Sequence, residues 1–164
     1  SFLDKKQEQP IQFSGCPSSM SKELRNTNQT NATSGDISSK LRQWPVQLHL
    51  INPNMPMFQG KDLLLAADCV PFAMGSFHGQ LLDGKMLAIA CPKLDSGKDV
   101  YLEKLIALIN DRKINTLTVA VMEVPCCNGL MQLAQMAVAQ SSRKVPIKQI
   151  TVSIEGNIID EKWV

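Results

Sequence analysis

The sequence contains five cysteines, and two of them, Cys126 and Cys127, are adjacent. This pair lies between a proline and an Asn-Gly dipeptide, after a β-branched run and before an apolar helical pattern. Thiolates bind soft metal ions and iron–sulfur clusters, and they also carry out disulfide exchange. Cysteine is also common in protein interiors, where it packs as a small hydrophobic residue. Choosing among these roles requires knowing where the fold places each cysteine.

The segments that must position the cysteines alternate between strand and helix patterns. Compact apolar runs predict strands over 62–68, 85–91 and 114–124. Amphipathic spacing predicts helices over 96–113 and 127–144. Near-continuous apolar strands that alternate with helices are typical of a parallel sheet covered by helices on its faces.

Three further segments complete the predicted architecture. Residues 76–84 read as a short helix, and the alternation of apolar residues over 46–50 indicates a short strand. Residues 147–161 predict a strand, a Gly-Asn turn and a return strand. We therefore expect a three-layer α/β/α domain with a mostly parallel, Rossmann-like sheet of about four or five strands, and a C-terminal β-hairpin at an antiparallel edge.

Four of the cysteines fall at the same place on this frame. Cys69 follows the first predicted strand, Cys91 ends the second, and Cys126 and Cys127 follow the third. In a parallel sheet the carboxyl ends of all strands form one edge, where such folds bind ligands. A proline stands within two residues of each of these sites. Thiolates gathered on one rim repel one another unless a cation or an oxidised bond compensates, and the natural cation is an iron–sulfur cluster, of the 4Fe-4S type for example, or Zn.

Several other polar residues are candidates for the same site. His78 is a possible metal ligand or proton donor, although a lone histidine in a short surface helix is more often solvent-facing. Lys93 can supply positive charge, and Asp68 and Glu123 end strands at the same edge, where they can tune the thiols or cap turns. His49 lies on a predicted strand and has a structural role in this reading.

Two residues before the helix of 96–113 have the composition of a helix N-cap. Asp95 and Ser96 precede the helical pattern that starts near Lys98, and such side chains accept hydrogen bonds from the first backbone N–H groups of a helix. We therefore expect Asp95 and Ser96 to cap this helix.

Composition bounds the domain organisation and the classes of partner. Residues 1–40 are rich in Ser, Asn and Thr, which predicts a flexible polar segment carrying Cys16, followed by a single α/β domain over 41–164. The net charge is +2 without a basic block, so nucleic acid is not an expected partner. No run is long enough to span a membrane and no secretory signal is visible, which favours a reducing cytoplasmic location. The chain lacks an initiator Met, so we expect either processing or a fragment of a longer protein.

Four motifs, "LRQWPVQLHL", "AADCVPFA", "ACPKLD" and "MEVPCCNG", are familiar as a set. Together they resemble the C-terminal domain of a family of ferredoxin-type 4Fe-4S binding proteins from anaerobic bacteria and archaea, and "SGCPSS" matches the short Gly-Cys-Pro element of that family. The resemblance implies an electron-transfer context and carries over the cysteine set Cys16, Cys69, Cys91, Cys126 and Cys127. The family's N-terminal ferredoxin module is missing from this sequence, so its two clusters do not carry over.

These observations lead to three hypotheses. The first is an electron-transfer accessory domain that binds an iron–sulfur cluster or another soft metal through Cys69, Cys91, Cys126 and Cys127, with Cys16 as a further ligand. Its partner is a ferredoxin module or another electron-transfer protein. The second is a thiol/disulfide redox domain that uses the same cysteines, and the third is a non-redox α/β interaction module. No Cys-x-x-Cys pair, Walker loop or G-x-G-x-x-G motif is present, and the question of an enzymatic reaction stays open.

Overall fold

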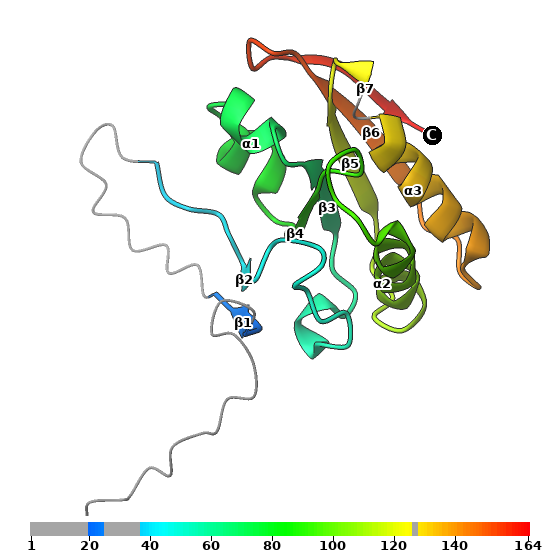
Figure 1. Ribbon diagram of the computed structural model, residues 1–164. Coiled ribbons are helices and arrows are strands. Elements are labelled where there is room, and N and C mark those ends of the chain that lie inside the picture. Colours follow the sequence, from blue (N-terminus) through cyan, green and yellow to red (C-terminus); the bar gives the residue numbers. More distant parts are fainter. Residues whose placement is uncertain (1–19, 25–36, 126–127) are drawn as a thin grey trace, which may run out of the picture.

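The computed structural model describes residues 20–24, 37–125 and 128–164. Cys16, Cys126, Cys127 and most of the polar segment expected over 1–40 lie outside the described residues. The described part of the chain forms one main sheet with helices on both faces (Figure 1).

The main sheet has five strands in the order β4-β3-β5-β6-β7. The first four run parallel to one another, and β7 is antiparallel to β6. Their bounds are β3 Leu63–Ala67, β4 Met86–Ala90, β5 Leu117–Met122, β6 Ile147–Val152 and β7 Ile158–Trp163. The prediction of a mostly parallel sheet with a C-terminal antiparallel edge is confirmed.

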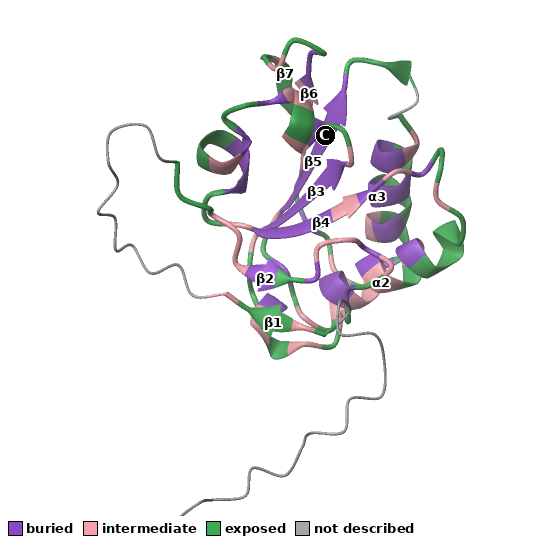
Figure 2. Ribbon diagram, turned by 60° about the vertical axis from the view of Figure 1, so that its left-hand side comes forward, coloured by how far each residue is buried: buried purple, intermediate pink, exposed green. Residues whose placement is uncertain are grey.

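The central strands are apolar at every position but Thr118 because both of their faces are covered. Every residue of β3 and of β5 is buried (Figure 2). A strand buried on both sides has no need for the alternation of polar and apolar residues that marks a half-exposed strand. The continuous runs in the sequence therefore reflect the middle position of β3 and β5 in the sheet.

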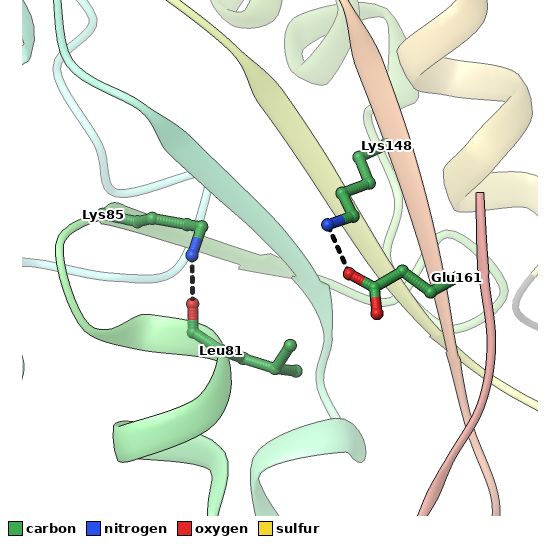
Figure 3. A network of polar contacts seen from close by, with 4 residues as sticks. All are labelled: Leu81, Lys85, Lys148 and Glu161. Atoms are coloured by element: carbon green, nitrogen blue, oxygen red, sulfur yellow. Dashed lines mark hydrogen bonds and ion pairs between the residues drawn. The ribbon is translucent and has the colours of Figure 1, made fainter. Parts of the chain in front are cut away.

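Helices cover the two faces unequally. The short helix α1 Val70–Ala73 lies on one face, and α2 Lys98–Asn110 and α3 Asn128–Gln140 lie on the other (Figure 1). The helix predicted over 76–84 is a π-helical turn, His78–Leu82, and Lys85 Nζ donates a hydrogen bond to the Leu81 carbonyl near its end, at 2.9 Å (Figure 3). The three-layer prediction is confirmed.

The strand order reverses between β3 and β5. From β3 the chain passes through α1 to β4 on one side, whereas from β5 it passes through α3 to β6 on the other. Because the two connections leave neighbouring strands in opposite directions, the loops separate at the carboxyl ends of β3 and β5 and leave a crevice. This switch point is where an open α/β sheet has room for a ligand.

The strand predicted over 46–50 is wrong. The strand in this region is β2 Gln43–Trp44, which pairs with β1 Lys22–Glu23, and Gln47 makes a single parallel bridge to Ile89 of β4. The chain then turns, with Leu50 N bonded to the Gln47 carbonyl at 2.9 Å. Val46 and Leu48 pack against the core beside β4, whereas Leu50 is exposed, and the segment pairs with the sheet at this one bridge only.

Gln43 covers the outer edge of β4 with its side chain. Its buried amide accepts a hydrogen bond from Leu87 N at 3.1 Å and donates one to the Leu87 carbonyl. One side chain thus occupies both backbone groups that a further strand would need at this position.

The opposite edge is the β6–β7 hairpin. Lys148 of β6 and Glu161 of β7 form an ion pair across the two strands (Figure 3). The turn contains Gly156, whose φ is +91° and where an added Cβ would lie 2.3 Å from the carbonyl oxygen of Ala73. Only glycine permits this contact, so the hairpin turn rests directly on the end of α1.

Candidate functional site

A cavity of about 180 Å³ lies at the switch point between β3 and β5. Residues that end or follow four parallel strands line it: Ala67, Asp68, Cys69, Cys91, Pro92, Met122, Val124 and Ile154. Its position matches the expected ligand site of an open α/β sheet, and its volume admits several water molecules or a metal ion with its ligands.

Two of the predicted site cysteines meet in this cavity. The register of β3 with β4 pairs Ala67 with Ala90, so Cys69 and Cys91 leave neighbouring strands at nearly the same level. Both are free thiols; Cys69 is exposed and Cys91 is half-buried. The expectation that cysteines from different strands share one rim holds for these two, whereas Cys16, Cys126 and Cys127 lie outside the described residues.

A closed turn fixes the backbone at Cys91. Asp95 Oδ2 accepts a hydrogen bond from Cys91 N at 2.9 Å, and Asp95 N donates to the Cys91 carbonyl at 2.8 Å. These reciprocal bonds close the "CPKLD" loop on itself. Proline at position 92 restricts φ in the same turn, so the thiol of Cys91 is carried on a well-defined piece of backbone.

Asp95 is held in turn by two side chains from other segments. The hydroxyl of Tyr101 donates to Asp95 Oδ2, and Gln47 Nε2 contacts Asp95 Oδ2 at 3.2 Å and the Tyr101 oxygen at 2.9 Å. Burial, followed by the Asp95 hydrogen bond, raises the pKa of Tyr101 well above its usual range, so the phenol stays a donor. The network anchors the Cys91 turn to α2 and to the segment along β4.

The helix cap expected from Asp95 and Ser96 is wrong. The residue before α2 is Gly97, with φ +71° and no side-chain cap. Asp95 is committed to Cys91 and Tyr101, and the Ser96 carbonyl lies 2.6 Å from His49 Nε2. The His49 ring also packs on Tyr101 with centroids 4.0 Å apart, which agrees with the structural role expected for this histidine.

Asp68 is the polar side chain of the cavity wall. Its Oδ1 atom is buried and has no hydrogen-bond partner among the described residues. Burial, with a smaller contribution from the negative charge of Asp95, raises the pKa of the Asp68 carboxyl. A partly buried carboxyl beside two thiols can accept a proton or a cation. A buried carboxyl oxygen without a hydrogen-bond partner is uncommon in folded proteins.

The remaining predicted site residues are placed differently. His78 does not line the cavity, and its Nδ1 accepts a hydrogen bond from the backbone N of Lys40 at 3.0 Å. Glu123 and Lys93 are exposed on the loops after β5 and β4. They contribute charge to the rim without lining the cavity.

Sequence reasoning missed Gln47 and Tyr101. Tyr101 is the only tyrosine in the chain and lies six residues after Asp95, on the first turns of an apolar helix. A buried tyrosine needs a partner for its hydroxyl, so an acidic residue just before the helix was an available signal. Gln47 had no such signal, because its role depends on how the chain runs beside β4.

The described residues alone do not complete a metal site. Among residues 20–24, 37–125 and 128–164, no three or more His, Cys, Asp or Glu side chains are grouped so as to hold a metal ion. The cavity supplies two thiols and one carboxyl. Cys126 follows the lining residue Val124 by two positions in the sequence, and two residues of chain span at most about 7 Å.

The mostly parallel sheet with helices on both faces defines a doubly wound α/β domain. The Rossmann-like domain family matches residues 55–164, and the chain belongs to this family. An uncharacterized protein of Archaeoglobus fulgidus is 26% identical over 120 residues, which cover 73% of this chain and 83% of the relative. No solved structure is significantly similar. Neither the family description nor the name of the relative specifies a ligand or a reaction.

None of the described helices is both long and apolar enough to cross a membrane.

Proposed function

We propose that this domain binds an iron–sulfur cluster or another soft metal ion through its rim cysteines and serves as an accessory domain in electron transfer. One observation carries the proposal: Cys69 and Cys91, which are 22 positions apart in the sequence, line one cavity at the switch point of the sheet.

The donor set suits a soft metal. Cys69 and Cys91 would supply two thiolates, and Cys126 and Cys127 are the candidates for the others because they follow Val124 so closely. Cys16 is a further candidate from the N-terminal segment. When bound, such a cluster supplies reversible one-electron transfer.

The surrounding residues have supporting roles in this proposal. Asp95 holds the Cys91 turn in one conformation, which reduces the entropy lost when the thiolate takes a ligand position. Met122, Val124 and Ile154 line the cavity with apolar surface, which lowers the local polarity on the side of the half-buried Cys91. The electron donor or acceptor would be a ferredoxin module or another electron-transfer protein.

Iron and acid-labile sulfide in anaerobically purified protein test the proposal. We expect a coloured protein with both elements and an electron paramagnetic resonance signal after reduction. Cys69→Ser and Cys91→Ser should each lower the iron content at least several-fold. Val124→Thr changes the same cavity wall without removing a thiol and should keep the iron. Colourless protein without iron, or variants that all retain it, would contradict the proposal.

A second candidate is thiol/disulfide chemistry at the same cysteines. It is favoured by the finding that only two thiols meet in the described cavity and that Cys69 is open to solvent. In this case Cys69 and Cys91 would form a disulfide and release two protons and two electrons to a disulfide-containing partner. Titration in glutathione buffers, followed by mass spectrometry, would show a defined Cys69–Cys91 bond, whereas thiols that resist alkylation until unfolding would indicate an inert interaction module.

A further inference from the structure

We propose that the loops at the carboxyl edge form a docking surface for a protein whose apolar contact face is bordered by Lys and Arg. The inference rests on the proposed function, because it concerns the partner of the cysteine site. Each of the four parallel strands is followed by a loop or short helix that exposes one large apolar side chain. These side chains, with their exposed fractions, are Phe72 (92%), Leu94 (84%), Val124 (36%) and Ile154 (66%).

The four side chains belong to the segments that contribute residues to the cysteine cavity. Val124 and Ile154 line it directly. Phe72 and Leu94 each lie three residues after a cavity cysteine, in α1 and in the Cys91 turn. The close approach of Gly156 to the Ala73 carbonyl brings the loop of Ile154 against the helix of Phe72, so these two apolar residues come from adjacent segments of the rim.

Large exposed apolar residues are ordinary when they are scattered over a surface, and this chain has others, such as Trp44, Met136 and Trp163. The rim set differs because four loops each contribute one residue around the same cavity. Apolar groups gathered in this way mark a contact surface, and their central position would place a partner next to the cysteines.

Charge decides which kind of partner fits. The described rim loops, residues 68–76, 91–97, 123–125 and 153–157, carry four carboxylates and one ammonium group, a net charge of −3 when all are ionised. The charged residues are Asp68, Asp95, Glu123, Glu155 and Lys93. The next two residues after the Cys91 turn are Lys98 and Asp99, whose opposite charges cancel.

An acidic rim disfavours the other occupants of an apolar face. A second copy docked rim to rim would bring like charges together, and an anionic membrane surface would be repelled. A partner with a basic border gains both attraction during encounter and burial of the apolar centre. Electron-transfer encounters typically have small, transient interfaces, which let the partner leave after transferring an electron.

The probe for the test is cytochrome c, a basic electron carrier with an apolar contact face. Its iron is replaced by zinc, so that the probe binds in the dark without exchanging electrons. The full isotope-labelled chain with reduced thiols is titrated with it and followed by amide chemical shifts. We expect the shifts at low salt to concentrate on Lys93, Leu94, Glu123 and Ile154 and to disappear at ten-fold higher salt.

Matched variants separate this face from non-specific binding. Phe72→Ser and Leu94→Ser should each weaken the apparent affinity at least five-fold. Ile159→Ser removes a similarly exposed apolar residue from β7, outside the rim loops, and should leave the affinity unchanged. Absence of binding, shifts centred on other elements, or equal affinities of the three variants would overturn the inference.

Of the two partner classes in the proposed function, the acidic rim favours another, basic electron-transfer protein over a ferredoxin, and an acidic ferredoxin is therefore the opposite probe. We expect it to bind the rim at least ten-fold more weakly than the basic carrier, and stronger binding would overturn the assignment of charge. The titration does not depend on metal content. Its failure therefore leaves the cysteine chemistry to be judged separately by iron and sulfide analysis.

Discussion

At the scale of single residues, Asp95 links the site to the scaffold. Its carboxylate accepts hydrogen bonds from the Cys91 backbone N–H, from the Tyr101 hydroxyl and from the Gln47 amide. Hydrogen bonds to an ionised acceptor are stronger than bonds between neutral groups, so the Asp95 carboxylate stabilises the Cys91 turn more than a neutral acceptor would. The conformation of a candidate metal ligand thus depends on residues that never line its cavity.

Tyr101→Phe should loosen the Cys91 turn. Removing the hydroxyl deletes one bond to the Asp95 carboxylate and should lower the free energy of unfolding by about 1.5–3 kcal/mol. Mass spectrometry after brief alkylation should show faster modification of Cys91, and urea unfolding gives the stability. Ile106→Val, on the same helix, loses packing without losing a hydrogen bond, and unchanged Cys91 reactivity is expected there. Equal alkylation rates in both variants would argue against the anchoring role.

Asp68→Asn should stabilise the protein at neutral pH. The folded state raises the pKa of Asp68, so the carboxyl favours the folded state while protonated and loses this contribution as pH rises through its folded pKa. The amide carries no charge to desolvate. We expect a gain of about 1 kcal/mol or less at pH 7, since solvent screens a partly buried group, and no gain below pH 4.

Urea unfolding of both proteins across this pH range measures the effect of Asp68→Asn. Asp83→Asn, at an exposed position, controls for the loss of one negative charge. A difference between wild type and Asp68→Asn that stays constant with pH would show that the charge of Asp68 is not its cause.

At the scale of elements, the sequence predicts those strands and helices whose burial determines the pattern of their apolar residues. The strands β3, β4 and β5 were predictable because each is a compact apolar run, and α2 and α3 because their apolar residues recur at helical spacing. The segment along β4 was not, since alternating residues pack as well beside an edge as within it. The start of α2 at Lys98 agrees with the sequence pattern, whereas the cap expected from Asp95 and Ser96 is wrong because Asp95 bonds to tertiary partners in place of the helix end.

The β6–β7 turn should be far more sensitive to substitution than its exposed position suggests. Gly156→Ala adds a Cβ that meets the Ala73 carbonyl at 2.3 Å, whereas Gly84, with φ +82°, has nothing within 4 Å of an added Cβ. Both changes place alanine in a left-handed conformation, at about 1–2 kcal/mol. Gly156→Ala should cost at least about 1 kcal/mol more by thermal or urea unfolding, because the backbone must also move. Equal losses would show that the hairpin does not rest on α1.

At the scale of the whole molecule, strand order converts distant cysteines into neighbours. Cys69 and Cys91 meet because β4 returns to the outer side of β3, and the cavity opens because β5 leads the chain away on the other side. The candidate site was therefore predictable as far as the shared edge of the sheet. Which wall residues complete it, such as Met122 and Ile154, follows from the packed loops and has no signature in the sequence.

Binding of a soft metal should stabilise the whole domain. With the metal-free chain and Zn²⁺ as a redox-inert probe at about 1,000 times its dissociation constant, the gain is about 4 kcal/mol. For a domain of this length the thermal midpoint should rise by roughly 10 °C. Cys91→Ser should abolish the rise and Ile159→Ser should preserve it. The same midpoint with and without Zn²⁺ in the wild-type chain would contradict a metal site at the rim.

The side chain of Gln43 has a consequence for behaviour at high protein concentration. By pairing with both backbone groups of Leu87, it removes a position at which a partly unfolded neighbour could add a strand and start an aggregate. The other edge, β7, carries Asp160, Glu161 and Lys162 in succession, and charged side chains oppose the same kind of addition. Strand addition is thus opposed differently at the two edges of the sheet. At β4 the Gln43 amide takes the hydrogen bonds that a strand would make, and at β7 charged side chains oppose pairing.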